Sequence, residues 1–507
     1  MAGERMAFWG LLAATFAVRA LDSGQPIVEN YVGRQIPTAM VARNLERGSG
    51  FFHPELDTGP FPNRFLVEPP IYAQVVALLR PAVGFGLEPT GRLVSAAATA
   101  LGAWGLYGIC RRRDGATVAL LAVASFGAFP VMVRYGRAFQ PDALMLGFVL
   151  AGLRGWDEFA AGGLRRWAAF GGFVLATGLA LKITLAWALI PLVTTLARLP
   201  IARRLALAAS MLAPALAWYA YAWGDVVGPG TGSMASFDNA AIWLGTLSPA
   251  AWVRLSTYDD IARALVVRSF TPLGFGLATL GLFGSGRLDP VWKAWGIGCG
   301  LSLLALAAKW HHGYYWMAVA PLAAIGVARG LVRVWAWGRA RYGRPAAAAL
   351  GSSFLALCVA QSASTFRTPV EWGSLAEAAC QVDALVPPDE LLIAPEALLY
   401  QADRRGFRLE FDPAAARRAA GEWGAALPDA ASPPALVEFY RTAGGSRAPG
   451  VGRPEDHTPG HSRPRFVADA GPDSADPRRR AWREAIRKRR DAKILVDRAD
   501  ILIAEFR

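Results

Sequence analysis

The sequence predicts a polytopic α-helical membrane protein with about eleven transmembrane helices and a small α/β domain at its C-terminus. Two observations lead to this fold class. The 507-residue chain is 54% hydrophobic and 18% charged, which is too apolar for an ordinary soluble protein. Its basic residues give a net charge of +14 and stand in short clusters between apolar runs. We attribute these clusters to membrane topology and expect no nucleic-acid partner.

The apolar runs define the predicted spans, because a bilayer core about 30 Å thick needs roughly 20 mostly apolar residues per helix. They lie near residues 7–21, 91–110, 115–133, 141–157, 167–182, 183–197, 203–222, 268–285, 291–308, 314–332 and 344–364. A further apolar stretch at 70–86 is interrupted by Arg80 and Pro81. We expect this stretch to lie in the membrane interface rather than to cross the bilayer.

The basic clusters orient these spans. With the N-terminus in the cytoplasm, every cluster falls on the cytoplasmic side, as the positive-inside rule requires. The clusters occupy residues 111–114, 154–166, 198–204, 286–293 and 329–344. The long loops at 22–90 and 223–267 and the C-terminal part of the chain then lie outside. A composition rich in Ala, Arg and Gly suggests a bacterium, so we expect the inner (plasma) membrane.

The chain changes character after about residue 365, and we divide it into a transmembrane module, 1–365, and an extracytoplasmic domain, 366–507. The second part contains a strand-like segment at 390–400, a basic helical segment at 478–490 and a closing strand-like segment at 494–506. A Pro/Gly/Ala/Ser-rich stretch at 412–477 separates them. This mixture predicts a small α/β domain.

The first outer loop is rich in carboxylates: Glu29, Glu55, Asp57 and Glu68. A carboxylate just outside a bilayer is partly desolvated, which raises its basicity and suits it to deprotonate an acceptor hydroxyl. The two prolines that follow Glu68 fix the backbone there. The alternative is a solvated loop whose acids face water.

Cations gather at the same predicted face of the membrane. Arg134 and Arg137 are three residues apart, so they share a helix face, and Asp142 opens the next span. Guanidinium groups match phosphate geometry, although arginines also extend to lipid headgroups. Lys182 divides one long apolar stretch, which marks either a membrane boundary or a functional site.

The segment "KWHHGYYWM" at 309–317 adds His311, His312, Tyr314 and Tyr315. The histidines are candidates to bind or protonate a phosphate leaving group, and the tyrosines to line a lipid or sugar pocket. The alternative is an interfacial aromatic belt. Adjacent histidines point in different directions, so we expect no metal site built from both.

Four sequence segments resemble a known family: "RQIPTAMVARNLERGSGFFHPELD" at 34–57, "VEPPIY" at 67–72, "YGRAFQPDALML" at 135–146 and "HHGYYWMAVAPLAAIGVARGL" at 311–331. They are similar to the polyprenyl-phosphate-sugar-dependent glycosyltransferases with the C-type (GT-C) membrane fold. The most similar group is the protein mannosyltransferase and lipid A aminoarabinose transferase superfamily, which is glycosyltransferase family 39-like. The resemblance covers roughly residues 7–365.

The resemblance implies an inverting transfer of a hexose or pentose from a polyprenyl-phosphate donor, held in membrane lipid, to an extracytoplasmic glycan, lipid or protein. A loop carboxylate would be the base, and basic residues would stabilise the leaving phosphate. By position, Glu68 matches the glutamate of the family's acid-x-Pro-Pro segment. Arg137, Asp142, Lys182 and the His311/His312–Tyr314 region match its phosphate side. We expect no cofactor, and the sequence gives no support for a divalent cation.

The sequence departs from the family at one position. An acidic residue is common at the start of the loop helix, where this chain has Arg34–Pro37. Asp57 is the substitute that we favour, because Gly59 and the nearby prolines can hold it close to Glu68, and Glu29 is the alternative. The departure leaves a non-catalytic envelope scaffold open. A lipid or glycan transporter is the other alternative, although the span interiors are nearly free of charge.

Overall fold

The computed structural model describes residues 2–27, 32–59, 61, 63–227, 250–284, 286–306, 310, 312–341, 344–409, 464–471 and 477–506. The chain forms two compact units. Unit 1 comprises residues 1–25, 71–219 and 242–367, and unit 2 comprises residues 26–70, 220–241 and 368–507. The segment 26–70 therefore groups with the C-terminal part of the chain.

Unit 1 is helical throughout its described elements. Its longer helices are α1 (Ala2–Ala20), α3 (Ile71–Val83), α4 (Leu87–Arg113), α5 (Ala116–Ala128), α7 (Asp142–Ala160), α8 (Arg165–Leu181), α10 (Ile201–Ala222), α14 (Pro272–Phe283), α15 (Pro290–Ala305), α16 (Ala320–Arg341) and α17 (Arg344–Ser362). Its shorter elements are α6 (Pro130–Tyr135), η1 (Ile183–Ala188), α9 (Leu189–Thr195), α12 (Ala250–Val253), α13 (Leu255–Ala262), η3 (Arg263–Ser269), η5 (Gly313–Val319) and η6 (Ala363–Phe366).

Each predicted span contains helix, and the chain is a polytopic membrane protein. In the described residues, four helices are long and apolar enough to cross a bilayer: Leu87–Arg113, Ile201–Asp225, Gly313–Arg341 and Ala348–Phe366. The pair Leu255–Ser269 and Pro272–Phe283, bent by 99°, would make a fifth. The apolar helices at Ile71–Val83, Ala116–Ala128 and Ile183–Thr195 are shorter, so the count of eleven stays a prediction.

A proline separates α5 from α6, and a buried arginine stabilises the break. Pro130 has no N–H to continue the helix ladder and stands at the first position of α6. Arg19 of α1 is 0% exposed and donates from Nε to Met132 O at 2.9 Å and from Nη2 to Gly127 O at 3.0 Å. Its guanidinium thus satisfies carbonyls on both sides of the break, which places α6 and the residues that follow it.

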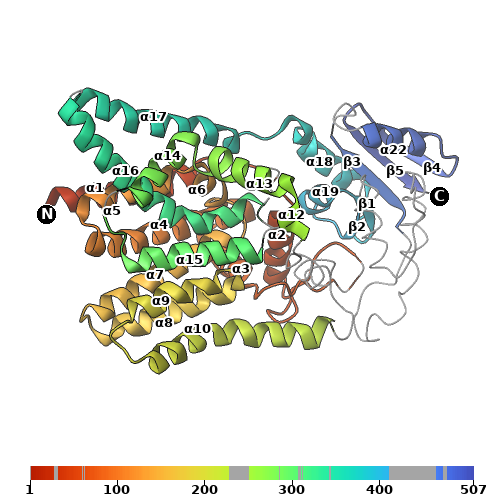
Figure 1. Ribbon diagram of the computed structural model, residues 1–507. Coiled ribbons are helices and arrows are strands. Elements are labelled where there is room, and N and C mark those ends of the chain that lie inside the picture. The colour runs from red at the N-terminus through yellow and green to blue at the C-terminus, as the bar shows by residue number, and fades with distance from the viewer. Residues whose placement is uncertain are drawn as a thin grey trace. The chain divides into compact units, whose positions relative to one another are not determined.

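Glycines allow helices of unit 1 to pack backbone against backbone. A Cβ atom at Gly281 of α14 would lie 1.8 Å from Gly326 O of α16. A Cβ atom at Gly147 of α7 would lie 2.3 Å from Ala98 O of α4. In both pairs the helices run side by side (Figure 1). Small residues at such crossings are typical of membrane helix packing, where close van der Waals contact replaces the hydrophobic effect.

Unit 2 contains helices and one five-stranded sheet. Its elements are α2 (Val32–Glu46), η2 (Trp223–Val227), η7 (Val370–Trp372), α18 (Leu375–Leu385), β1 (Leu392–Ala394), α19 (Glu396–Gln401), β2 (Gly406–Arg408), β3 (Phe466–Ala470), α22 (Pro477–Arg487), β4 (Ala492–Asp497) and β5 (Ile501–Phe506). The strand order is β2-β1-β3-β5-β4; β1 is parallel to β2 and β3, and β5 is antiparallel to β3 and β4.

Helix α22 covers one face of this sheet (Figure 1). Its Trp482 and Ile486 are both 0% exposed and pack into the core with Val467 of β3 and Leu502 of β5. The four-residue spacing puts both side chains on one face of the helix. Arg483 between them is also buried and donates from Nε to Asp469 Oδ2 at 2.9 Å, while Arg480 and Arg487 are exposed. The basic segment is therefore an amphipathic helix of a folded α/β layer.

The first loop extends this sheet at its edge. Gly406 N donates to Asp57 O at 2.9 Å, and Gly59 N donates to Gly406 O at 2.7 Å. A Cβ atom at Gly406 would lie 1.9 Å from Leu392 O, so only glycine fits between the loop and β1. Asp57 is thereby fixed through its backbone to the C-terminal sheet.

Candidate active site

Lys182 is a buried cation of unit 1. It follows α8 in an extended conformation, with φ −164° and ψ 108°, and η1 begins directly after it. Its Nζ donates to Asp142 Oδ1 at 2.7 Å, and the two residues are 7% and 2% exposed. The break between α8 and η1 thus directs an ammonium group toward the first residue of α7.

Aromatic rings surround this ammonium group. Lys182 Nζ lies 4.3 Å from the ring centroid of Tyr314 and 5.2 Å from that of Tyr315. The ring of His312 stacks on Tyr314 with a centroid separation of 5.6 Å, and Tyr135 meets Tyr314 edge-on at 6.1 Å. Such cation–π contacts are worth about 2 kcal/mol when the cation is desolvated. The structure therefore brings together Lys182 with four of its predicted companions: Asp142, His312, Tyr314 and Tyr315; His311 lies outside the described residues.

The two predicted arginines differ in their surroundings. Arg137 is 0% exposed, and its guanidinium donates to four oxygens. These acceptors are Leu21 O at 2.8 Å, Asp22 O at 2.7 Å, Gln25 Oε1 at 3.2 Å and Thr365 O at 3.3 Å. Arg134 is half-buried, and its Nε is buried without a hydrogen-bond partner among the described residues. Arg137 thus connects segments of unit 1.

Lys182 and its neighbours Asp142, His312, Tyr314 and Tyr315 form what we call the Lys182 cluster. This cluster is chemically suited to bind an anion beside a polar, uncharged group. An ammonium carries three donors, and Asp142 takes one of them. Asp142 Oδ2 is buried and, in the part of the chain that the structure describes, has no hydrogen-bond partner. The site therefore offers an oxyanion a positive charge and offers a hydroxyl an acceptor.

Glu68 and Arg34 form an ion pair in unit 2. Their side chains are 9% and 13% exposed, and the Arg34 guanidinium lies 5.5 Å from the ring centroid of Phe65. Arg34 belongs to α2, at the position where the family resemblance led us to expect an acid. Arg34, which stands where an acid was expected, is therefore the ion-pair partner of Glu68, the candidate catalytic glutamate.

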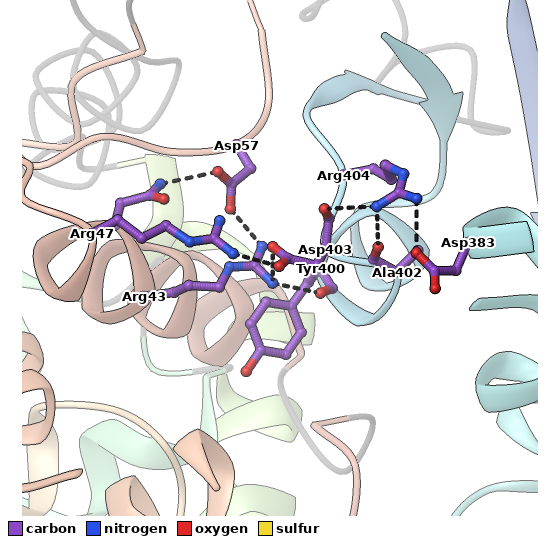
Figure 2. A network of polar contacts seen from close by, with 9 residues as sticks. Arg43, Arg47, Asp57, Asp383, Tyr400, Ala402, Asp403 and Arg404 are labelled. Atoms are coloured by element: carbon purple, nitrogen blue, oxygen red, sulfur yellow. Dashed lines mark hydrogen bonds and ion pairs between the residues drawn. The ribbon is translucent and has the colours of Figure 1, made fainter. Parts of the chain in front are cut away.

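Asp57 is held by two donors from α2. Arg43 Nη2 donates to Asp57 Oδ2 at 2.6 Å, and Asn44 Nδ2 donates to Asp57 Oδ1 at 3.0 Å. Asp57 is 2% exposed, so it is almost fully withdrawn from solvent. Figure 2 shows its carboxylate directed at the Arg43 guanidinium. The structure places Asp57 and Glu68 with separate arginine partners, and Glu29 lies outside the described residues.

Arg43 also binds the turn before β2. Its Nη1 pairs with Asp403 Oδ1 at 2.9 Å and donates to Tyr400 O at 2.8 Å (Figure 2). Arg47, directly after the end of α2, pairs with the same Asp403. Partial burial alone would raise the pKa of Asp403, but the hydrogen bond from Arg47 and the charge of Arg43 outweigh it and lower the pKa. The loop that carries Asp57 is thus tied to the C-terminal segment by side chains as well as by backbone.

Sequence reasoning did not identify Arg34, Arg43 or Asn44 as partners of the loop acids. Spacing gave the only usable signal, because residues four apart, such as Arg43 and Arg47, share a face when the segment is helical. In the structure both arginines pair with carboxylates. Contacts between residues far apart in sequence cannot be read from periodicity. Within the described residues, no group of three or more His, Cys, Asp or Glu side chains is placed to hold a metal ion.

Comparisons with known proteins agree with this architecture. The family model described as dolichyl-phosphate-mannose-protein mannosyltransferase matches residues 67–223. No curated protein matches the sequence. The crystal structure of ArnT from Cupriavidus metallidurans bound to undecaprenyl phosphate is similar with a TM-score of 0.62 at 16% identity, covering 100% of this chain and 98% of that chain.

Two further solved structures share the fold. The oligosaccharyltransferase AglB from Archaeoglobus fulgidus, in complex with an inhibitory peptide and a dolichol-phosphate, has a TM-score of 0.58 at 11% identity and covers 98% of this chain and 74% of its own. The arabinofuranosyltransferase AftD from Mycobacteria has a TM-score of 0.56 at 15% identity and covers 100% of this chain and 40% of its own. The resemblance inferred from the sequence motifs is thus confirmed, and the chain has the fold of the C-type (GT-C) membrane glycosyltransferases.

Proposed function

We propose that the protein transfers a sugar from a polyprenyl-phosphate-linked donor to an acceptor outside the cytoplasm. The observation that carries this proposal is the Lys182 cluster, a desolvated ammonium beside Asp142 and two tyrosine rings. Burying a cation in an apolar helical unit is costly, and Lys182 has one ion-pair partner among the described residues, Asp142, so it keeps donors for a ligand. The neighbours in fold that carry undecaprenyl phosphate and dolichol-phosphate support a lipid-linked phosphate as that ligand.

The phosphate that leaves during the reaction accounts for the role of the cations in unit 1. When the bond between the anomeric carbon and the phosphate oxygen breaks, its electron pair stays on the phosphate. Lys182 offers two further donors to that oxyanion, and Arg134 supplies a second positive charge in the same unit. His312, stacked on Tyr314, is the candidate to give the departing phosphate a proton. These groups would stabilise charge that develops during the reaction.

The base is assigned to Glu68. It would accept the proton of the acceptor hydroxyl while that oxygen bonds to the anomeric carbon on the face opposite the phosphate, which inverts the configuration. The ion pair with Arg34 orients the carboxylate. Asp57, whose two oxygens already receive hydrogen bonds from Arg43 and Asn44, is a positioning residue for this loop rather than the base.

The test is complementation of a bacterial strain that lacks the protein, followed by mass analysis of its envelope glycans and lipids. The wild-type gene is expected to restore a mass difference of one hexose or pentose. Lys182→Met and Glu68→Gln are each expected to lower the product by roughly 100-fold or more, since positioned acid–base and charged groups contribute factors of that size. Asp57→Asn is expected to keep part of the activity, because Asn44 and the backbone bonds to Gly406 still hold the loop.

Lys293→Met is the matched control, because Lys293 lies exposed on α15 and has no ion-pair partner among the described residues. It should restore the product like the wild type. A full product level with both Lys182→Met and Glu68→Gln, at normal protein abundance, would contradict the assignment of the site. Movement of a lipid-linked sugar across vesicles without any covalent change would favour a transporter instead.

A further inference from the structure

The turn that joins α6 to α7 is fixed by side chains from α4. Thr99 Oγ1 donates to Gly136 O at 2.9 Å, and Ser95 Oγ donates to Ala138 O at 2.7 Å. The N–H of Gln140 also donates to Ala138 O, at 2.8 Å. Because a packed helix supplies these donors, the turn is held in one conformation together with the side chains that it carries.

Gln140 is the exception in this well-satisfied turn. It is 0% exposed, and neither Oε1 nor Nε2 has a hydrogen-bond partner within the described ranges of the chain. Two residues later, Asp142 Oδ2 is buried and equally lacks a partner there. Buried amides and carboxylates are nearly always hydrogen-bonded, and leaving them unmatched lowers stability. Asp142 is the ion-pair partner of Lys182, and the unmatched atoms of both side chains are explained when a ligand supplies their missing partners.

The chemistry of these atoms selects the ligand. Gln140 offers one acceptor and one NH₂ donor, and Asp142 Oδ2 offers a charged acceptor. An ionised phosphate has acceptors only, and the Asp142 carboxylate would repel it. An amino group would leave the Gln140 NH₂ unmatched and would add a second cation next to Lys182, whose Nζ is 2.7 Å from the other oxygen of Asp142. Hydroxyl groups both donate and accept, so they match all three positions.

We propose that Gln140 and Asp142 bind hydroxyl groups of the donor's sugar, and that this sugar is a neutral hexose or pentose rather than an amino sugar. The inference rests on the proposed function, because the sugar reaches the cluster as part of the lipid-linked donor. It divides the site into a phosphate side at Lys182 and a sugar side at Gln140. A site built to hydrogen-bond hydroxyls discriminates strongly against ligands that lack them.

The variant Gln140→Met tests this division, since methionine has a similar length and no hydrogen-bonding group. The probes are undecaprenyl phosphate and its glucose, mannose, arabinose and glucosamine conjugates, and the readout is binding to purified full-length protein. We expect Gln140→Met to weaken the best neutral-sugar conjugate by about tenfold or more, which corresponds to losing one or two hydrogen bonds. Its binding of undecaprenyl phosphate is expected to stay unchanged.

Thermal unfolding without ligand is a second measurement. If the Gln140 side chain had a structural role, its removal would lower the melting temperature. Removing a buried amide without partners should leave the melting temperature unchanged or raise it. The matched control is Ser125→Ala, because Ser125 is 2% exposed and donates to Leu121 O at 2.8 Å, so its removal breaks a satisfied contact. The control should lower the melting temperature and leave binding of every conjugate intact.

Three results would overturn the inference while leaving the proposed function in place. In the first, Gln140→Met binds the neutral-sugar conjugate as tightly as the wild type does. In the second, Gln140→Met loses as much affinity for undecaprenyl phosphate as for that conjugate. In the third, the wild type binds the glucosamine conjugate most tightly of all the probes. The proposed function fails separately, and the inference with it, if wild type and Lys182→Met bind undecaprenyl phosphate equally weakly. Lys182→Met is otherwise expected to weaken every probe.

Discussion

Arginine and lysine are used differently at the scale of single residues. Arg19 and Arg137 are both 0% exposed and donate to backbone carbonyls where helices break or end. Arginine suits this role because its five donors form a fixed fork, and its charge is lost only with difficulty. Lys182 instead meets one carboxylate and two aromatic rings. A buried cation with spare donors is therefore a stronger sign of function than a buried cation whose donors are used.

The pH dependence of unit 2 is also decided by individual side chains. The pKa of Asp403 is lowered in the folded protein by its two arginine partners, Arg47 and Arg43. A lowered carboxyl pKa contributes stability above the unfolded value of about 3.9, and that contribution is lost as the pH falls through the folded value. Asp403 is half-exposed, so the contribution is about 1 kcal/mol or less.

Asp403→Asn is accordingly expected to lower the melting temperature at pH 7 slightly and to make its decline on acidification shallower. The measurement is thermal unfolding of purified protein between about pH 3 and pH 7. Asp389→Asn is the matched control, because Asp389 is exposed and has no ion-pair partner in the described part of unit 2. Identical pH profiles for Asp403→Asn and the control would show that the pairs with Arg43 and Arg47 do not stabilise the fold.

Backbone contact decides how the elements of unit 1 pack. Helices α14 and α16 meet at Gly281, Gly326 and Gly330, where each added Cβ would collide with a backbone atom of the facing helix. Residues such as these cannot gain a side chain unless the two helices separate. The same helix α14 carries Gly276, whose Cβ position has no atom within 4 Å.

Gly281→Ala is therefore expected to destabilise the protein by about 1–3 kcal/mol, the usual cost of overpacking. Gly276→Ala in the same helix should be neutral or should stabilise by up to about 1 kcal/mol, because alanine has the higher helix propensity. The measurement is thermal unfolding in detergent, with both variants purified alike. Equal melting temperatures for the two variants would mean that α14 and α16 do not pack through this glycine contact.

At the scale of the whole molecule, the main result is which segments of the chain belong to the same unit. Residues 26–70, which hold both Asp57 and Glu68, belong to the same unit as the C-terminal sheet. Main-chain bonds from Asp57 and Gly59 to Gly406, together with the Arg43–Asp403 pair, connect them. The C-terminal segment is thus part of the support for the proposed catalytic loop, and its sidedness must match that of the loop.

Native cysteines allow this sidedness to be measured. Cys380 is exposed on α18 of unit 2, whereas Cys110 and Cys358 are buried and Cys299 is half-buried. If unit 2 faces the outside, a membrane-impermeant maleimide should label Cys380 in intact spheroplasts, and Cys380→Ser should abolish that labelling. Labelling that requires lysis of the spheroplasts would place unit 2 in the cytoplasm and would remove the proposed acceptor side.

The sequence determined the features that depend on local pattern. Apolar runs located the helices, and the resemblance carried by short segments such as 67–72 and 135–146 indicated the C-type fold. Spacing and composition also selected Lys182, Asp142, Tyr314 and Tyr315, because unusual polar residues in apolar surroundings stand out along the chain. These residues then met in one cluster.

Tertiary structure alone decided which charged and polar groups pair with each other. Arg34 with Glu68, Arg43 with Asp57, and the bond between Gly406 and the first loop join residues whose separation in sequence has no periodic signature. The distinction between Arg134 and Arg137, which look equivalent along one helix face, likewise depends on carbonyls contributed by distant segments. Burial makes such partners decisive, because a desolvated polar group must be matched wherever the folded chain places it.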